Sequence, residues 1–320
     1  MRAAVLHTPG SSPSYGEHPA PAASPGSTLV RVTAAPVVPL DLLCASGTSY
    51  FGTPATPYVP GGQGVGIVEA SDTCPVGARV WFYTPAGMRP GDGSMAELCL
   101  VPDADVVALD EGVPDELAAA LGLSGVAAWM ALSWRARLQP GERVLVLGGG
   151  GAVGQSGIGA ARALGASVVV AVARTSSVDR ARTAGADLVV PLGGDADALA
   201  AALTESGPFD VVLDPVWGHA ATAASRVLAE GGRLVNLGGA SGDVATLQSS
   251  VLRSRSASVL GYTNNALSAE QRATAISAVL EHAAAGRIRM SYDVLPLAEV
   301  ERTWADQADG APPARWVLRP

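Results

Sequence analysis

Apolar and polar positions follow two different patterns along the chain. From Met1 to about Pro114, short apolar runs are separated by Gly and Pro. Runs this short, bounded by turn-forming residues, are typical of β-strands. We therefore expect a β-rich unit, with strands at Ala3–Leu6, Thr28–Thr33, Val65–Glu69, Arg79–Tyr83 and Ala96–Val101.

From about Asp115 the pattern changes to alanine-rich segments of helical length that alternate with apolar runs. The runs are VLVLG, SVVVAV, LVVPL, FDVVLDPV, GRLVNLGG and SASVLGY. This alternation predicts βαβ units, and hence a parallel sheet with helices on both faces. Gly165, Gly185 and Gly286 each follow an alanine-rich segment, where a left-handed residue ends many helices. Ser268 and Gln271 predict a capping box for the last helix.

After Gly286 the strand-like pattern returns, and the sequence closes with RWVLRP. We therefore expect residues 287–320 to rejoin the β-rich unit of residues 1–116. Residues 117–286 are expected to form an α/β unit inserted between them. The predicted fold class is α/β, with a doubly wound parallel sheet inserted into a β-rich domain.

The composition argues against several classes of function. All 21 basic residues are arginines, and without lysine neither Schiff-base catalysis nor a P-loop is available. The formal net charge of -8 argues against binding to nucleic acid or to an acidic membrane surface. The first residues do not have the pattern of a signal peptide, and we expect no apolar run of the ~18 residues that span a membrane. A cytoplasmic protein is the expectation.

The four consecutive glycines from Gly148 to Gly151 connect an apolar run to an expected helix at Ala152–Leu164. Glycines in a strand-to-helix turn leave room for a pyrophosphate at the helix N-terminus, where free N–H groups favour anions. We interpret the turn as a dinucleotide site; a plain tight turn is the alternative. The candidate residues are Gly149, Gly151 and Gly154, which fit G-x-G-x-x-G, with Ala152 and Val153.

The end of the next apolar run, AVARTSSVDR, indicates which cofactor is bound. An NAD site usually carries Asp or Glu there to bind the ribose 2′-hydroxyl, and no carboxylate stands at this position. Arg174, Ser176, Ser177 and Arg180 instead suit a 2′-phosphate. We therefore expect NADPH (NADP+) rather than NADH, the alternative being that these are solvated residues at the start of a helix.

Ten segments occur in the order found in a known family. They are VTAAPVVPLDLL, YVPGGQGVGIVEA, VGARV, SMAELCLVP, LGLSGVAAWMAL, RLQPGERVLVLGGGGAVG, AGADLVV, FDVVLDPVWG, EGGRLVNLGG and RWVLRP. Over essentially its whole length, the chain resembles the medium-chain dehydrogenase/reductase superfamily, in its zinc-independent quinone oxidoreductase and enoyl reductase branch. The resemblance implies a chaperonin-10 (GroES)-like β domain joined to a Rossmann domain, an active site between them, and a homodimer.

The chain departs from this family at the positions that hold zinc in other members. Zinc-dependent members have Cys in a G-x-x-C-G-x-D loop and His in a G-H-E motif; here Val38 and Gly61-Gly62-Gln63 take these places. The cysteine-rich lobe is missing, so no tetrahedral zinc site can be identified in the sequence. Without that Lewis acid, reduction of a conjugated C=C bond is favoured over alcohol chemistry. Val38 also replaces the Asn of an N-P-x-D motif of quinone reductases, which indicates a more apolar pocket.

The resemblance supplies the remaining candidate residues. Tyr50, in ASGTSYFG, matches an S-G-x-Y loop with one residue inserted and is the candidate proton donor; a packed or rim aromatic is the alternative. Tyr262 is expected beside the nicotinamide or in interdomain packing. Asn236, Gly238 and Gly239 extend the cofactor site at the carboxyl edge of the sheet. The candidate substrate pocket consists of Val38, Asp41, Tyr50, Trp217 and Tyr262, with Asp41 favoured in a structural role.

The predicted function is an NADPH-dependent, zinc-independent oxidoreductase that transfers hydride to the conjugated C=C bond of a quinone, enone or enoyl substrate. Two alternatives stay open: a zinc-free reductase or dehydrogenase acting on C=O or C=N, and a non-catalytic NADPH-binding protein. The expected partners are a small-molecule substrate and a second copy of the chain, with no metal, no nucleic acid and no membrane.

Overall fold

The computed structural model describes residues 1–310 and 312–320 and divides into two compact units. Unit 1 combines Met1–Gly122 with Ser291–Pro320, and unit 2 is Leu123–Met290. The first division falls later in the chain than the sequence pattern suggested, because helix α2 (Asp115–Met130) runs past residue 116 and bends at Gly122. Gly122 has φ 24° and ψ -127°, which interrupts the helix at that point.

Unit 1 is built on a seven-stranded sheet in the order β14-β15-β3-β4-β5-β7, with β6 paired to β3. Its strands are β3 (Ser27–Pro36), β4 (Gln63–Ala70), β5 (Arg79–Tyr83), β6 (Leu98–Pro102), β7 (Val106–Ala108), β14 (Tyr292–Pro296) and β15 (Arg315–Arg319). A separate antiparallel pair is formed by β1 (Arg2–Val5) and β2 (Ser14–Glu17). The helices that lie wholly in unit 1 are α1 (Pro39–Ala45) and α9 (Val300–Ala308), with 3-10 turns at Asp103–Asp105 and Leu297–Glu299.

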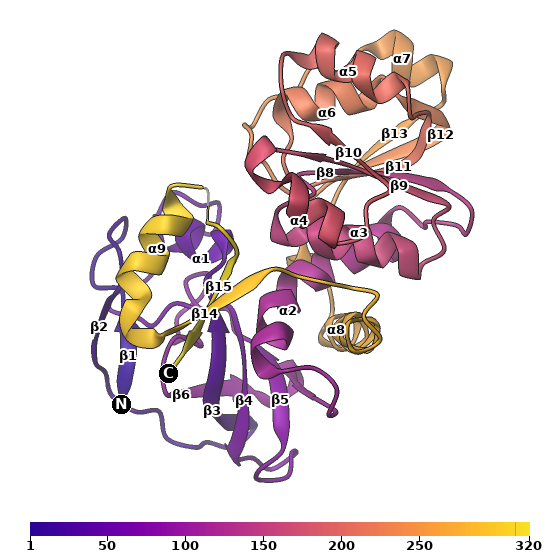
Figure 1. Cartoon of the computed structure of the whole chain (residues 1–320). Helices are drawn as coiled ribbons and strands as arrows, with labels where there is room; N and C mark the ends of the chain where they lie inside the picture. The colour runs from indigo at the N-terminus through magenta and orange to yellow at the C-terminus, as the bar shows by residue number, and fades with distance from the viewer. Residues whose placement is uncertain (311) are drawn as a thin grey trace. The chain divides into compact units, whose positions relative to one another are not determined.

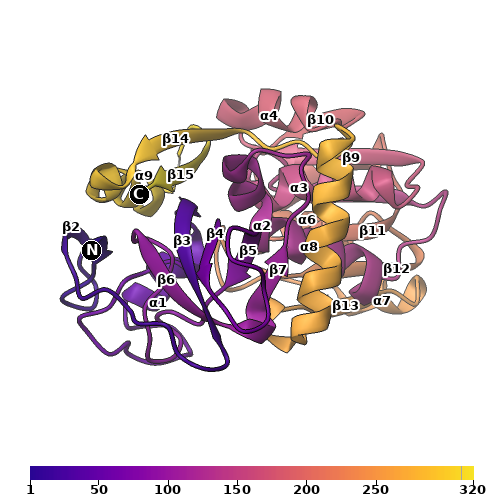
Figure 2. The same ribbon diagram turned by 90° about the horizontal axis from the view of Figure 1, so that it is seen from below.

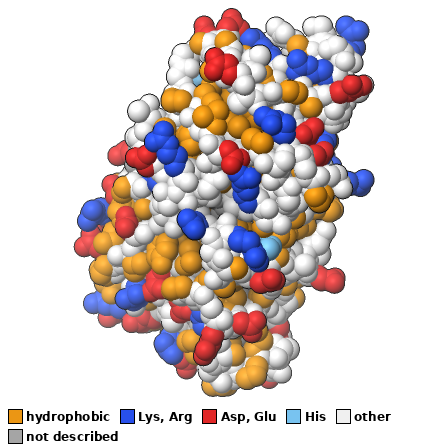
Figure 3. All heavy atoms as spheres, turned by 45° about the vertical axis from the view of Figure 1, so that its right-hand side comes forward, with side chains coloured by type: hydrophobic (Ala, Val, Ile, Leu, Met, Phe, Trp, Pro, Cys, Tyr) orange, Lys and Arg blue, Asp and Glu red, His pale blue; other side chains and the backbone are white. Residues whose placement is uncertain are grey.

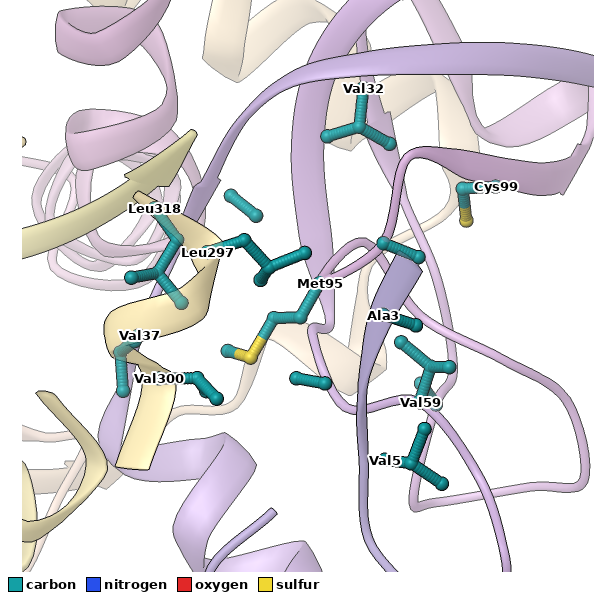
Figure 4. Packing of buried hydrophobic residues seen from close by; sticks show 14 of the residues in the cluster. Ala3, Val5, Val32, Val37, Val59, Met95, Cys99, Leu297, Val300 and Leu318 are labelled. Atoms are coloured by element: carbon teal, nitrogen blue, oxygen red, sulfur yellow. The ribbon is translucent and has the colours of Figure 1, made fainter. Parts of the chain in front are cut away.

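A buried cluster joins the two ends of the chain within unit 1. Figure 4 shows Ala3 and Val5 from β1 in the same cluster as Leu297, Val300 and Leu318 from the C-terminal segment. Each of these side chains is 3% exposed or less. The segment also adds strands to the sheet, since β15 pairs with β3. The C-terminal residues therefore complete the core of the β-rich unit.

The C-terminal segment contains a helix that the strand-like sequence pattern did not predict. In α9, Val300, Thr303 and Trp304 are buried at positions i, i+3 and i+4, which is the spacing of one helical face. With only three buried positions in nine residues, the helical period is too short to stand out in the sequence. The strand-like pattern after Gly286 therefore matches β14 and β15, and α9 lies between these two strands.

Unit 2 contains a six-stranded parallel sheet in the order β10-β9-β8-β11-β12-β13. The strands are β8 (Arg143–Leu147), β9 (Val168–Ala173), β10 (Leu188–Pro191), β11 (Phe209–Asp214), β12 (Leu228–Asn236) and β13 (Ser258–Gly261). Counted within the unit, this is the order 3-2-1-4-5-6 of doubly wound nucleotide-binding sheets, and the predicted fold class is confirmed. The order reverses between β8 and β11, and ligands of such sheets bind at the carboxyl ends of the strands there.

Helices cover both faces of this sheet (Figures 1 and 2). They are the second half of α2, α3 (Ala152–Ala163), α4 (Val178–Thr183), α5 (Ala196–Thr204), α6 (Gly218–Ser225), α7 (Ser249–Ser254) and α8 (Ala269–Ala284). A π-helical turn at Ala131–Arg135 and 3-10 turns at Thr175–Ser177 and Asn264–Ala266 complete the unit. The predicted glycine stops are confirmed, with positive φ at Gly165, Gly185 and Gly286, and so is the capping box of Ser268 and Gln271.

The helical segment Asp115–Arg135 is long and apolar enough to cross a membrane by length and composition alone. The expectation that no run reached this length was therefore wrong. Of its most apolar window, 72% is buried inside the structure. On the molecular face shown in Figure 3, positive and negative side chains are interspersed.

Candidate functional site

The turn between β8 and α3 exposes the N-terminus of a helix. Gly148 leaves β8 with φ 65°, and the amide of Gly149 donates a hydrogen bond to the carbonyl of Val172 on β9 at 2.8 Å. Gly151 is the N-cap of α3 and makes no side-chain cap hydrogen bond. The first amides of a helix have no acceptor within it, and in α3 these include the amides of Ala152 and Val153. The turn therefore offers donors to an anion.

Close packing explains why this turn needs glycine at particular positions. A Cβ atom at Gly154 would lie far inside contact distance of the Gly148 carbonyl oxygen, and one at Gly149 would lie 2.7 Å from the Cβ of Ala171. A Cβ at Gly151 would meet only the Gly148 oxygen, at 3.3 Å. Gly149 and Gly154 thus let the helix approach the sheet, whereas Gly151 borders more open space.

Gln155 braces the turn, and the sequence reasoning did not identify it. Its side chain is 4% exposed, and its Nε2 donates a hydrogen bond to the carbonyl oxygen of Gly150 at 3.1 Å. The only sequence signal is a polar residue on an otherwise small-residue helix face. Its partner is a backbone atom of the turn, which composition and spacing do not reveal.

The loop after β9 gathers positive charge. Arg174 and Ser176 are exposed, and Arg180 on α4 is half-buried. Burial, and then the positive charge of Arg174, lower the pKa of the Arg180 guanidinium. The positive charges of the two arginines therefore interact, and an anion bound at this loop would be stabilised by both.

Ser177 occupies a different environment from the other residues of this loop. It is 5% exposed, and its hydroxyl donates a hydrogen bond to the carbonyl oxygen of Arg174 at 3.1 Å. Sequence reasoning grouped Ser177 with the exposed Arg174 and Ser176 as a phosphate ligand. The structure instead places its side chain beneath the loop.

Three of the predicted cofactor residues are connected at the carboxyl edge of the sheet. Asn236 ends β12, and its Nδ2 donates a hydrogen bond to the Gly238 carbonyl oxygen at 2.8 Å. The Tyr262 amide donates to the Asn236 carbonyl oxygen at 2.9 Å, and burial raises the pKa of the Tyr262 phenol. The neighbouring Gly239 is exposed. These residues form one hydrogen-bonded rim after β12 and β13.

Asp214, which the sequence reasoning did not select, organises the adjacent end of β11. Its side chain is fully buried, and its Oδ1 accepts hydrogen bonds from the amides of Val216 at 2.9 Å and Trp217 at 2.8 Å. Burial raises the pKa of this carboxyl, while the two amides and Asn236 oppose the shift. An Asp directly after a buried strand, in FDVVLDPVWG, was the available signal.

Trp217 has a backbone conformation that is normally reserved for glycine. Its φ of 59° and ψ of -151° fall in a region that side chains rarely enter. Its ring packs against a buried cluster that includes Ala220 and Ala221 of α6. Packing and the Asp214 carboxylate together hold this conformation next to the candidate cofactor edge.

In unit 1, Asp41 connects two loops. It is 4% exposed, its Oδ2 accepts the Val38 amide at 2.9 Å, and its Oδ1 accepts the Gly62 amide at 3.0 Å. Burial raises its pKa to about 6, against the opposing effects of these amides and of the Arg315 charge. Both oxygens are directed at backbone, which is the structural role that the sequence favoured.

Tyr50 and Val38 have opposite exposures in unit 1. Tyr50 is 78% exposed, and its ring centroid lies 4.2 Å from that of Phe51. Val38 is 5% exposed.

Among the described residues, no group of three or more His, Cys, Asp or Glu side chains could hold a metal ion.

Two family models match the chain in the order of its units. A model described as "Alcohol dehydrogenase GroES-like domain" matches residues 24–111, and one described as "Zinc-binding dehydrogenase" matches residues 152–281. Together they cover more than half of the chain. The second description refers to a metal for which the described residues provide no ligand cluster.

Curated relatives match part of the chain. Quinone oxidoreductase-like protein 2 of Bos taurus is 33% identical over 227 residues, which cover 69% of this chain and 63% of the relative. One of the subunits of the phenolphthiocerol/phthiocerol polyketide synthase of Mycobacterium tuberculosis is 34% identical over 218 residues, which cover 65% of this chain and 9% of that protein. The matches thus span less than two thirds of the length of either relative.

Solved structures match the complete chain. An NAD-dependent alcohol dehydrogenase has a TM-score of 0.88 at 25% identity, with 100% of both chains covered. A mycobacterial protein solved in complex with NADPH has a TM-score of 0.86 at 24% identity, also over 100% of both chains. The likeness to the second protein concerns the fold alone.

Proposed function

The chain belongs to the medium-chain dehydrogenase/reductase superfamily, and on that premise we propose that it is an NADPH-dependent oxidoreductase that reduces the conjugated C=C bond of a quinone, enone or enoyl compound. One observation carries the proposal: the uncapped N-terminus of α3 at the glycine turn, together with Arg174 and Arg180 beyond the end of β9. A diphosphate suits the first feature and a 2′-phosphate suits the second.

In this proposal, different residues of unit 2 bind different parts of the cofactor. The amides of Ala152 and Val153 bind the diphosphate, and Gly151 leaves room for it. Arg174, Ser176 and Arg180 bind the 2′-phosphate. The same fold occurs in a mycobacterial protein solved with NADPH and in an NAD-dependent enzyme, so the fold alone does not decide between the two nucleotides. In this proposal, the arginines after β9 therefore determine the preference for NADPH over NADH.

When bound, the reduced nicotinamide supplies a hydride to the β-carbon of the conjugated acceptor. The rim of Asn236, Gly238 and Tyr262 orients the nicotinamide end of the cofactor. Asp214 keeps the neighbouring turn in place through the amides of Val216 and Trp217. Tyr50 is the proposed proton donor to the α-carbon.

The relatives support a C=C substrate over an alcohol. A quinone oxidoreductase-like protein is among them, and the described residues provide no ligand cluster for the metal that would polarise an alcohol oxygen. The polyketide synthase of Mycobacterium tuberculosis, by its name, acts in polyketide synthesis, which fits an enoyl thioester as one form of the substrate.

The substrate class is tested by following NADPH oxidation with quinones, enones, enoyl thioesters, ketones and imines. We expect turnover with at least one of the first three and not with simple ketones or imines. Turnover confined to ketones or imines would contradict the proposal and indicate C=O or C=N reduction. NADPH binding without any turnover would indicate a non-catalytic binding protein.

We also propose that the protein is a cytoplasmic homodimer that acts on a small molecule. β13 is an edge strand of the six-stranded sheet, so its outer backbone groups can pair with a second copy. Light scattering of the purified protein measures this directly. A monomer at micromolar concentration would contradict the dimer without affecting the proposed reaction.

A further inference from the structure

Ser177 lies between the two parts of the proposed cofactor site. On one side is the glycine turn that would bind the diphosphate, and on the other is Arg174, which would bind the 2′-phosphate. Ser177 is 5% exposed, so its side chain is enclosed by protein. A residue in this place contacts both parts, so its side chain can fix Arg174 relative to the glycine turn.

The contact with the glycine turn is direct. A Cβ atom at Gly150 would lie 2.7 Å from the carbonyl oxygen of Ser177 and even nearer to its Cβ and Oγ. Real Cβ atoms essentially never come this close to another atom. The backbone of Gly150 therefore packs against Ser177 with no space for a side chain between them.

The polar contact is with Arg174. Both the hydroxyl and the amide of Ser177 donate hydrogen bonds to the Arg174 carbonyl oxygen, at 3.1 Å and 2.8 Å. Two donors on one carbonyl fix the peptide from which the Arg174 side chain extends. The hydroxyl of this buried side chain makes the second of these bonds, so it strengthens the loop and is already engaged within the protein.

From this geometry we infer that Ser177 is a positioning residue that sets the preference for the 2′-phosphorylated dinucleotide, by fixing the Arg174 peptide against the glycine turn. The inference rests on the proposed NADPH site and deepens it. It replaces the role that the sequence suggested for Ser177, which was direct binding of the phosphate.

A purely structural residue would affect the binding of NADPH and NADH alike, whereas a residue that positions Arg174 would affect NADPH binding alone. The diphosphate is common to NADPH and NADH, whereas only NADPH carries the group that Arg174 would contact. Ser177→Ala removes the hydroxyl but keeps the Cβ that packs on Gly150. The glycine turn is then retained, and the Arg174 peptide loses one of its two hydrogen bonds.

The test is a fluorescence titration of NADPH and NADH with the wild type and with Ser177→Ala. Loss of one hydrogen bond predicts weaker NADPH binding by about threefold to tenfold, with NADH binding changed by less than about twofold. Thr175→Ala, which removes an exposed hydroxyl from the same loop, is the matched control and is expected to change neither.

A double-mutant cycle with Arg174→Ala adds a second readout. If Ser177 acts through Arg174, Ser177→Ala should have no further effect on the NADPH preference in the Arg174→Ala background. Equal weakening of both nucleotides, no weakening, or additive effects in the double variant would overturn the inference alone. Wild-type protein that binds neither nucleotide, or binds them equally, would overturn the proposed NADPH site and this inference with it.

Discussion

The buried carboxylate of Asp214 holds the backbone amide of Trp217 at 2.8 Å, at the carboxyl end of β11. Trp217 has φ 59° and ψ -151°, a conformation that costs a non-glycine residue about 1–3 kcal/mol. The hydrogen bond therefore stabilises a strained peptide at the edge of the sheet where the cofactor is proposed to bind. A change at Asp214 should affect stability and nucleotide binding together.

Replacing Asp214 with Ala is expected to lower the free energy of unfolding by about 2–3 kcal/mol, because the amides of Val216 and Trp217 lose a buried acceptor. Asp214→Asn, which keeps one oxygen, should recover most of this loss. Asp243 is exposed, and Asp243→Ala is the control, with a change within about 0.5 kcal/mol. Denaturant unfolding measures all three. An Asp214→Ala variant as stable as the control would show that the carboxylate does not hold this turn.

The glycine turn gives a graded prediction. Gly154→Ala places a Cβ against the Gly148 oxygen and is expected to cost about 1–3 kcal/mol of stability. It should also weaken NADPH binding by about tenfold or more, a change of at least about 1.4 kcal/mol. Gly151→Ala, whose Cβ would meet this oxygen at 3.3 Å, should cost less than about 1 kcal/mol of stability. Thermal unfolding and titration compare the two, and equal stability losses would contradict the packing described.

The pH dependence of stability should contain a contribution from Asp41. Burial raises its pKa from 3.8 to about 6, so the folded protein binds this proton more tightly than the unfolded chain. The resulting stabilisation is fully present below about pH 4 and is lost as the pH rises through about 6. Over this range the wild type should lose up to about 3 kcal/mol relative to Asp41→Asn, which does not titrate.

The measurement for Asp41 is the difference in unfolding free energy between the wild type and Asp41→Asn at a series of pH values. Curves that run parallel from pH 4 to 7 would mean that the Asp41 carboxyl keeps an ordinary pKa. The variant loses one hydrogen-bond acceptor at every pH, so only the slope of the difference carries the test.

Tyr50→Phe tests the proposed proton donor. Because Tyr50 is 78% exposed, its loss should change stability by less than about 0.5 kcal/mol. Loss of a proton donor should lower kcat by about 100-fold or more, with NADPH affinity unchanged. Tyr15→Phe, at another exposed tyrosine, is the control and should leave kcat unchanged. A Tyr50→Phe enzyme with the wild-type rate would exclude Tyr50 from the chemistry.

Local signals account for the features that the sequence predicted well. The capping box at Ser268 and the glycine stops at Gly165 and Gly286 depend on a few adjacent residues, and each is present. The alternation of apolar runs with alanine-rich segments was enough to predict the six parallel strands of unit 2. These features require no knowledge of which distant residues meet.

The features that the sequence did not predict depend on distant contacts. The bend at Gly122 occurs where a Cβ would collide with the Gln63 side chain on β4, a residue far away in sequence. Asp214 and Gln155 act on backbone amides and carbonyls, which have no signature in composition. Ser177 could be assigned to a phosphate from its position, but only the fold shows that its hydroxyl is directed at Arg174.

Parallel titration of the protein with NADPH and NADH tests the central claim most directly, with Arg174→Ala and Arg182→Ala alongside the wild type. The wild type should bind NADPH more tightly than NADH, and Arg174→Ala should weaken NADPH by about tenfold to a hundredfold while sparing NADH. Arg182→Ala, which removes an exposed arginine of the same helix as Arg180, should leave both affinities unchanged. Tight binding of NADH with weak binding of NADPH, or no binding of either nucleotide, would contradict the account.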